Sequence, residues 1–470
     1  MTLRPAIALM VVGGLVTSGC NLAPRYERPA LPVSQTLPAR EGQPATTAED
    51  AVTINEVSWQ DFIADEKLRQ VIALGLANNR DLRVAAANIE QARALYRIER
   101  ADLLPTAVVG ADASFQRQPA NRTVNGDRNT EAYSVNVGLA AFEIDLFGRI
   151  RNLSEAALEQ YLATAEARNA VQISLVAEIA QAYLTMAADQ EQLRISLETL
   201  GTFRQSLDLT RAQFEAGIAS ELGVRQAQTS YDQARFDIAR NRALVAQDQN
   251  ALNLLVGTMV PADLLPNGLP AESAVLTNLP ADVRSEVLLR RPDVQRAEHL
   301  LIAQNANIGA ARAAFFPSIS LTAVAGTLSG SLSGLFGGGT GNWSVAPSAT
   351  LPIFDFGRNR ANLRYTEASR DAAVAEYELA IQTAFREVAD ALAVRATIDE
   401  QLAARRSLLE AATKAYQISD ARFRAGVDPF LTTLDAQRTL YSAEQVLTQT
   451  RLAQMSNLVE LYRALGGGLR

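Results

Sequence analysis

Cysteine, histidine and lysine are almost absent from this chain of 470 residues. Cys20 is the single cysteine and His299 the single histidine, so the chain can form neither an internal disulfide nor a zinc cluster of cysteine and histidine ligands. It also lacks a P-loop and a G-x-S-x-G nucleophile motif. Because carboxylates alone are a weak signal of catalysis, we predict that the protein is not an enzyme and has no catalytic residue, metal site or cofactor.

Aromatic residues are also scarce, and acidic residues outnumber basic ones. Aromatic side chains make up only 6% of the residues although hydrophobic ones make up 48%, so the apolar content is mostly alanine, leucine and valine. This mixture is typical of long helices that pack closely through small side chains. The formal net charge of −7 argues against a surface that binds nucleic acid or anionic membranes.

The first twenty residues have the pattern of an export signal. Arg4 precedes an apolar stretch, 6–16, that is too short for a transmembrane helix and leads into "VTSGC". "SGC" resembles the lipobox of bacterial lipoproteins, although Thr17 replaces the usual aliphatic residue. The resemblance implies that Cys20 carries a diacylglycerol and an N-acyl chain, and Asn21 in place of aspartate points to the outer membrane. The alternative is an ordinary signal peptide with a chance cysteine.

Proline and glycine are missing from two very long stretches. Residues 151–216 contain no proline and only Gly201, and residues 358–425 contain neither type. A helix of 66 residues would be roughly 100 Å long. Soluble domains rarely hold helices of that length, so we expect coiled-coil partners.

The chain contains an internal repeat. Three pairs of segments match in the same order at offsets of 212, 209 and 209 residues: 81–105 with 293–317, 146–151 with 355–360, and 214–228 with 423–437. Three matches at nearly constant spacing indicate a tandem duplication of a unit of about 200 residues.

Each repeat contains segments with the alternation of β-strands. In "YSVNVGLAAF" (133–142) and "WSVAPSATLPIF" (343–354), apolar residues alternate with small or polar ones. Polar or Gly/Ser-rich loops are expected at 116–131 and 326–342. Strands of about ten residues with one apolar face fit a membrane-spanning barrel, whereas strands of a soluble sandwich have the same period.

The number of strands implies an oligomer. Two hairpins supply four strands, a bilayer tolerates no open strand edge, and known barrels begin at about eight strands. One chain therefore cannot close a barrel, and identical chains must share it. The count leaves open a dimer with eight strands or a trimer with twelve.

Several longer motifs resemble those of one family. "FGR" after the outgoing strand and "RFRAGVDPFLTTLDAQR" are similar to TolC-type outer membrane efflux proteins. "SGCNLAPRYERP", "LRRPDVQRAEHLL" and "ARAAFFPSISLTA" resemble the acylated, OprM-like branch of NodT-type lipoproteins. The resemblance covers essentially the whole mature chain.

The resemblance implies a mainly α fold with a small β part, in which a homotrimer forms a 12-stranded transmembrane β-barrel continued by a periplasmic α-helical barrel. Such a protein is the exit duct of a tripartite efflux system in the Gram-negative outer membrane. Its partners are a periplasmic adaptor protein and an inner-membrane pump, usually of the proton-driven RND type.

The expected organisation divides the chain into six parts. They are a signal peptide (1–19), a lipid-anchored equatorial segment (20–68), a first repeat (69–256, hairpin 105–148), an equatorial linker (257–285), a second repeat (286–462, hairpin 317–357) and a tail (463–470).

Two turns lie at the helix ends opposite the strands. Gly217 and Gly426 permit the backbone reversal that bulkier residues resist. The resemblance implies that Gly217 with Ile218, and Gly426 with Val427, dock the hairpins of the adaptor. Without the resemblance, plain hairpin turns are the simpler interpretation.

Only the second turn matches the family's gate. Asp435 corresponds to an aspartate at the narrowest point of the closed pore, where threefold symmetry would gather like charges. Leu431 corresponds to an apolar gate ring one helical turn earlier. The gate set is completed by residues whose contacts to the neighbouring helix pair hold the tip shut: Arg422, Phe423 and Asp428. Composition alone would make Asp435 a solvated helix carboxylate.

The chain also departs from the family pattern. Thr432 replaces a second gate aspartate of TolC, and Phe423 replaces a tyrosine and its hydroxyl. The repeat places Gln226 opposite Asp435 and Ala219 opposite Asp428, so we expect the first helix pair to stay fixed while the second swings outward. The rival interpretation is a lipid-anchored periplasmic coiled-coil scaffold or adaptor without a pore.

Overall fold

The structure, a computed structural model, describes residues 20–37, 57–119, 129–270, 273–276 and 284–467. The expected signal peptide, 1–19, lies outside these residues. So do parts of the expected equatorial segment and linker, namely 38–56, 271–272 and 277–283.

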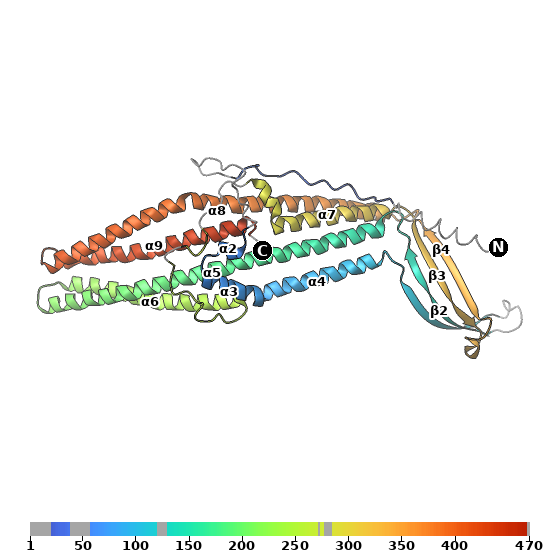
Figure 1. Cartoon of the computed structure of the whole chain (residues 1–470), viewed down its shortest axis with the longest axis horizontal. Coiled ribbons are helices and arrows are strands. Elements are labelled where there is room, and N and C mark those ends of the chain that lie inside the picture. The colour runs from blue at the N-terminus through green and yellow to red at the C-terminus, as the bar shows by residue number, and fades with distance from the viewer. Residues whose placement is uncertain (1–19, 38–56, 120–128, 271–272, 277–283, 468–470) are drawn as a thin grey trace. The chain divides into compact units, whose positions relative to one another are not determined.

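The order of elements is the same in both halves of the chain (Figure 1). The first half contains α4 (Arg80–Ala101), β1 (Ala107–Arg117), β2 (Asn129–Glu143), α5 (Arg149–Glu215) and α6 (Glu221–Val256). The second contains α7 (Pro292–Ala313), β3 (Ser318–Ser329), β4 (Gly341–Thr350), α8 (Arg358–Arg424) and α9 (Phe430–Ala464). The short elements are α2 (Trp59–Phe62), α3 (Glu66–Asn78), η3 (Ser285–Arg290) and η4 (Leu332–Gly334).

Local sequence explains where the helices begin and end. Asn79 precedes α4, and its Oδ1 accepts a hydrogen bond of 2.8 Å from the Leu82 N–H, which satisfies one free donor of the first turn. Ser220 caps α6 in the same way. Gly257 ends α6 in the left-handed region, at φ +77°, where glycine is favoured. α7 begins at Pro292, whose fixed φ suits the first helical position.

Two buried stripes show how the long helices pack. Along α8, fully or nearly fully buried residues follow at steps of three and four: Ile381, Ala384, Val388 and Ala391. This is the spacing of a coiled-coil seam. Between α5, α6 and α9, a second cluster gathers around Phe203, Ala234 and Leu434.

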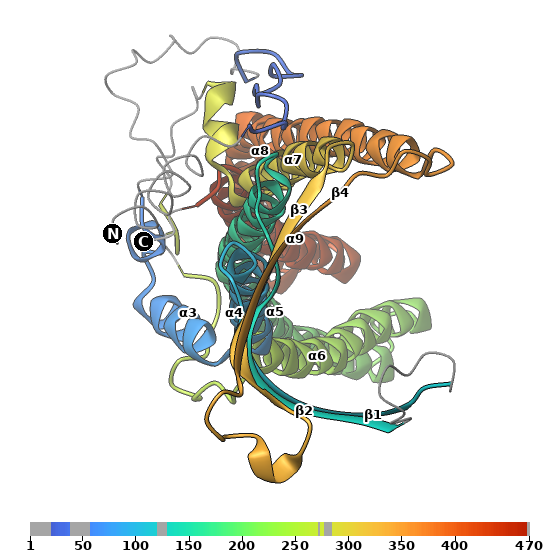
Figure 2. The ribbon, with the colours of Figure 1, turned by 90° about the vertical axis from the view of Figure 1, so that its right-hand side faces the viewer.

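The four strands form one curved antiparallel sheet in the order β1-β2-β3-β4 (Figure 2). The two predicted hairpins are present, and they join through the β2–β3 pairing. β3 runs on to Ser329, so the glycine-rich segment begins as strand rather than loop. Pro347 lies in β4, an outer strand of this sheet, where a missing N–H is tolerated. β1 and β4 each pair on one side only, so this sheet has two open edges.

The chain divides into two compact units. One holds the sheet with residues up to 30, 88–165 and 296–377, and the other holds 31–87, 166–295 and 378–470, including both helical turns. By length and composition, α5 is the one helix in the described chain that could span a membrane. However, 56% of its most apolar window is buried within the protein, as in a core helix.

Candidate functional site

The two helical turns have the same backbone structure. Gly217 and Gly426 lie in the left-handed region at φ +73° and +71°. After each helix the glycine N–H bonds the carbonyl three residues back, and the next residue's N–H bonds the carbonyl five residues back. This is the Schellman pattern that ends helices at a left-handed glycine. A Cβ atom on either glycine would meet nothing within 4 Å, so only backbone strain requires glycine there.

An aliphatic side chain stands exposed immediately after each glycine. Ile218 is 78% exposed and Val427 is 62% exposed. The structure therefore brings each predicted docking pair, Gly217 with Ile218 and Gly426 with Val427, to the outside of its turn. Exposed aliphatic groups at matching places of both repeats suit an apolar contact with a partner.

The second turn is closed by an ion pair that the first turn lacks. Arg422 Nε lies 2.5 Å from Asp428 Oδ2, and its Nη2 lies 2.9 Å from Oδ1. The hydrogen bonds from Arg422 hold the pKa of Asp428 below its usual range, so the pair is charged at neutral pH. The sequence predicted contacts from these residues to a neighbouring helix pair, whereas within this chain they bind each other. Ala219, at the matching position, offers no such partner.

The other predicted gate residues fall into two groups. Phe423 packs on Phe430 with ring centroids 5.3 Å apart, inside its own turn. Leu431 is 51% exposed and Asp435 is also exposed, one helical turn apart on the same face of α9. Within the described part of the chain, no side chain bonds the Asp435 carboxylate.

Sequence reasoning missed a set of polar contacts between α9 and the first helix pair. Tyr441 donates its hydroxyl proton to Asp237 of α6 over 3.0 Å, and the same oxygen lies 3.0 Å from Ser196 Oγ of α5. Burial above all, with Asp237 adding to it, raises the pKa of Tyr441 to about 12, so this hydroxyl stays protonated. Gln437 accepts a hydrogen bond of 3.3 Å from Ser206.

Arg438, the residue after Gln437, makes a further contact to the first helix pair. Its Nε donates to Ser230 Oγ at 2.6 Å, and its Nη2 donates to the Gln226 carbonyl at 3.0 Å, both on α6. In the repeat alignment Arg438 stands opposite Thr229, and this divergence was the available signal.

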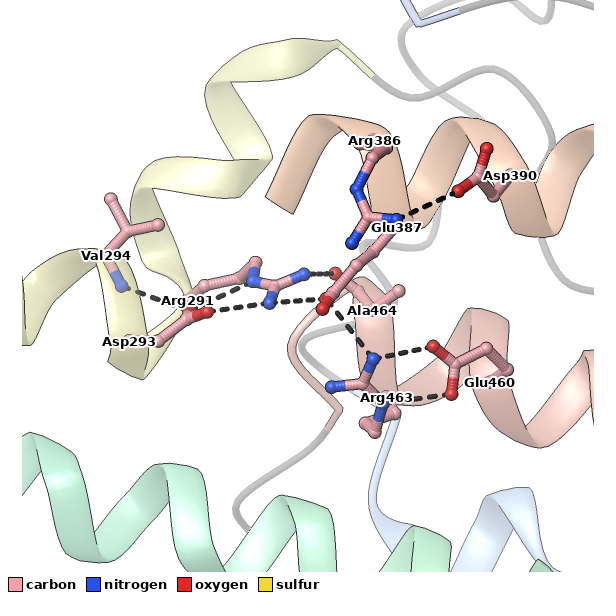
Figure 3. A network of polar contacts seen from close by, with 9 residues as sticks. All are labelled: Arg291, Asp293, Val294, Arg386, Glu387, Asp390, Glu460, Arg463 and Ala464. Carbon is pink, nitrogen blue, oxygen red and sulfur yellow. Dashed lines mark hydrogen bonds and ion pairs between the residues drawn. The ribbon is translucent and has the colours of Figure 1, made fainter. Parts of the chain in front are cut away.

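The other end of α9 is fixed by a buried arginine (Figure 3). Arg291 is only 4% exposed and binds Asp293 at 2.7 Å and Glu387 of α8 at 2.9 Å. It also donates to the carbonyl of Ala464, the last residue of α9, where a positive charge is favourable. Burial acts to lower the pKa of Arg291, but its two carboxylate partners raise it, so the side chain stays charged.

A second arginine completes this network. Arg463 shares Glu387 at 3.3 Å and also binds Glu460 at 2.6 Å (Figure 3). One carboxylate of α8 therefore links the start of α7 to the end of α9, through Arg291 and Arg463.

Cys20, the first residue that the structure describes, lies beside the junction of β2 and α5. The Cys20 N–H donates to the Leu146 carbonyl at 3.1 Å, and the thiol is exposed and free. Gly148, the glycine of "FGR", has φ +79°, and a Cβ there would approach the Cys20 carbonyl to 3.0 Å. Further on, Arg28 binds the buried Glu298 of α7 at 2.7 Å. The segment is thus held to the sheet-containing unit at both ends.

Nothing in the described residues forms a cluster of three or more potential metal ligands. His299, the single histidine, is half-buried with its Nδ1 2.6 Å from Glu159 Oε2. This contact joins α7 to α5.

Comparison with known proteins decides the family. The model of the outer membrane efflux protein family matches residues 71–258 and 283–467. The chain belongs to this family. The match includes both repeats and both turns.

Individual relatives agree over nearly the full length. The toluene efflux pump outer membrane protein TtgC of Pseudomonas putida is 48% identical over 460 residues, which cover 98% of this chain and 95% of the relative. Outer membrane protein OprJ of Pseudomonas aeruginosa is 44% identical over 468 residues, 99% and 96% of the two chains. The crystal structure of the open state of the MtrE outer membrane channel of Neisseria gonorrhoeae aligns with a TM-score of 0.87 at 38% identity. The alignment covers 96% of this chain and 99% of the MtrE chain.

These findings confirm several predictions from the sequence. The protein is an outer membrane efflux channel of the TolC type, mostly helical with a small antiparallel sheet, from the Gram-negative outer membrane. Its family is one of transport channels rather than enzymes. The rival interpretation as a scaffold without a pore is therefore wrong.

Proposed function

We propose that three copies of this chain form one continuous duct, with twelve strands in the outer membrane and a helical barrel in the periplasm. The observation that carries the proposal is the four-stranded sheet with an open edge on β1 and another on β4. An open edge in lipid leaves backbone N–H and C=O groups unpaired, so the edges must meet those of other copies. β4 is exposed along its whole length and carries Trp343 and Val345 at alternate positions, which suits a face toward lipid.

The oligomer can be tested by native mass spectrometry of the detergent-extracted protein. We expect a mass of three chains, together with a discrete ion conductance in planar bilayers. A monomer in detergent, or a bilayer without any conductance, would contradict the shared barrel.

The proposed system has three components and exports small toxic organic compounds. The duct receives them from an inner-membrane pump, usually of the RND type, through a periplasmic adaptor. The names of relatives, which include toluene and antibiotic efflux proteins, support this class of cargo. Deleting the gene and measuring susceptibility to a panel of solvents and antibiotics tests it, and an unchanged profile would contradict it.

The adaptor is proposed to dock on the two exposed turns, through Gly217 with Ile218 and Gly426 with Val427. Replacing Ile218 and Val427 together by serine should weaken adaptor binding, because it removes the two aliphatic contacts. Pull-down of the adaptor by the purified channel measures this, with conductance as a check that the channel still forms. Undiminished adaptor binding would place the docking surface elsewhere.

The gate is proposed to consist of Asp435 and Leu431 on the pore-facing side of α9, with Arg422, Phe423 and Asp428 closing the turn. Three copies of Asp435 around one axis would attract cations and resist close approach. Replacing Asp435 and Arg422 by alanine should raise single-channel conductance and reduce cation preference. The matched control is Arg204→Ala with Asp208→Ala, an exposed pair on α5 with the same change in charge. Unchanged conductance and selectivity in the gate variant would refute the assignment.

We also propose that Cys20 is lipidated and begins the mature chain, after removal of residues 1–19. The Cys20 main-chain N–H is bound at the membrane end of α5, and its thiol is free and exposed, so acyl chains can reach lipid beside the sheet. The mass of the mature protein tests this. We expect a chain starting at Cys20 with a diacylglycerol and one N-acyl group, whereas an unmodified thiol would exclude the anchor.

The remaining organisation follows from this assignment. Residues 20–68, the linker 257–285 and the tail 463–470 are proposed to form an equatorial belt around the helical barrel, between the repeats 69–256 and 286–462. Limited proteolysis of the assembled channel should then cut within the belt before it cuts the long helices.

A further inference from the structure

The loop that joins β3 to β4 carries no charged residue. It connects Ser329 to Gly341, and the whole stretch around it, 313–354, is uncharged. The matching loop segment of the first repeat, 116–131, has five charged residues. Because charged side chains almost always stay in contact with water, their absence from the second loop favours a less polar surrounding.

Two large apolar side chains project from this loop. Leu332 is 66% exposed and Phe336 is 79% exposed. Leu335 lies between them in the sequence and is only 6% exposed, so its side chain anchors the loop to the protein. In Figure 2 the loop extends beyond the ends of β3 and β4 on the outer, convex side of the curved sheet. In a closed barrel, the convex side of the sheet is the side that faces lipid.

The backbone of the loop supplies partners for its own polar groups. The Gly334 N–H donates to the Ser331 carbonyl at 3.2 Å, and the Gly337 N–H donates to the Gly334 carbonyl at 2.9 Å. The Thr340 hydroxyl lies 3.0 Å from the Leu335 carbonyl and 2.9 Å from the Gly337 carbonyl, so its proton serves both. Backbone groups need such internal partners wherever lipid excludes water.

We propose that the loop 330–340 enters the outer leaflet of the membrane, with Leu332 and Phe336 in contact with lipid acyl chains. The inference rests on the proposed barrel, which places the convex side of the sheet in lipid. It adds a membrane contact at the extracellular end of the second repeat. Lipid fits this surface better than the other hairpin loop of a neighbouring copy, because 116–131 would bring charges against an apolar face.

Spin labels in vesicles can measure where the loop lies. A nitroxide is attached to Leu332→Cys or Phe336→Cys in the full chain, reconstituted into phosphatidylcholine vesicles. Its collisions with oxygen, which concentrates in lipid, are compared with its collisions with a water-soluble nickel chelate. The matched control is Gln118→Cys, an exposed position beside Arg117 at the end of the first hairpin. The unchanged protein, labelled in the same way, gives the background from Cys20.

We expect the ratio of oxygen to nickel collisions to be several times higher at positions 332 and 336 than at 118. Leu332→Asp should lower the ratio at position 336 toward that of the control, because a carboxylate is costly to bury in lipid. An unchanged ratio in Leu332→Asp would overturn the proposal.

The other outcomes separate this proposal from the barrel itself. Ratios at 332 and 336 equal to that at 118, in a trimer that conducts ions, would place the loop in water and overturn the proposal alone. Labels shielded from both reagents would also overturn it, because protein from a neighbouring copy would then cover the loop. A monomer without conductance would refute the proposed barrel and this inference together.

Discussion

Replacing Arg291 by alanine should release the end of α9 from its support. Arg291 is 4% exposed and serves three acceptors: the Asp293 carboxylate, the Glu387 carboxylate and the Ala464 carbonyl. Removing one partner of a buried ion pair costs about 3 kcal/mol or more, because the remaining charge stays buried without compensation. Arg463 still reaches Glu387 at 3.3 Å, so we expect the lower end of that range, about 3 kcal/mol.

Arg386, which precedes Glu387 on α8, provides a control. It pairs with Asp390 at 3.6 Å, but both side chains are more than two-thirds exposed (Figure 3). An exposed pair at this spacing contributes at most about 0.5 kcal/mol. Both substitutions remove one arginine, so the difference between them reports burial and hydrogen bonding rather than net charge.

Amide hydrogen exchange read by mass spectrometry measures the effect locally. Exchange in the last turn of α9 should become roughly 100-fold faster in Arg291→Ala, and less than about threefold faster in Arg386→Ala. Glu387→Gln should lie between them, because Arg291 keeps Asp293. Equal acceleration in the two arginine variants would refute the claim that the buried network fixes this helix end.

Two further predictions concern turns and pH. Gly217→Ala and Gly426→Ala should each destabilise their turn by about 1 kcal/mol, because alanine is strained in the left-handed backbone conformation. Gly201→Ala inside α5 should stabilise the helix by about the same amount. Amide hydrogen exchange in each segment measures these changes, and a change of the same sign at the turns and at Gly201 would contradict the reasoning. Burial, with the charge of Asp189, raises the pKa of Asp248 to about 6. Because protonation of Asp248 then favours the folded state, the free energy of unfolding should fall as the pH rises from 4 to 7. Asp248→Asn should make this fall smaller, by less than about 1 kcal/mol because the site is partly exposed. Thermal unfolding of the variant and the unchanged protein between pH 4 and 7 measures the effect. The same pH dependence in both proteins would contradict the prediction.

The elements could be predicted because their signals are local and repeated. The absence of proline over 151–216 and 358–425 predicted two helices. Their observed bounds, Arg149–Glu215 and Arg358–Arg424, differ from the predicted ones by at most two residues. Alternation at 133–142 located β2, but the strand proved longer, at Asn129–Glu143. A strand can extend into a polar segment when the adjacent strand supplies backbone hydrogen bonds. The alternation of apolar and polar side chains in the sequence gives no sign of such pairing.

The contacts within the candidate site could not be predicted in the same way. Arg291 and Glu387 are separated by 96 residues, and Arg438 and Ser230 by 208, so no local period relates them. Arg422 and Asp428 are only six residues apart, yet they were expected to reach other helices. Their pairing depends on the backbone reversal at Gly426, which turns the two side chains toward each other.

Divergence between the repeats therefore carries information that each repeat alone lacks. Four positions near the second turn bear charge where the first bears none: Arg422 against Gln213, Asp428 against Ala219, Asp435 against Gln226, and Arg438 against Thr229. In the proposed trimer and gate, an aspartate in both repeats would gather six like charges instead of three at one level, and their mutual repulsion would oppose a closed pore. Placing the aspartate in one copy limits that repulsion.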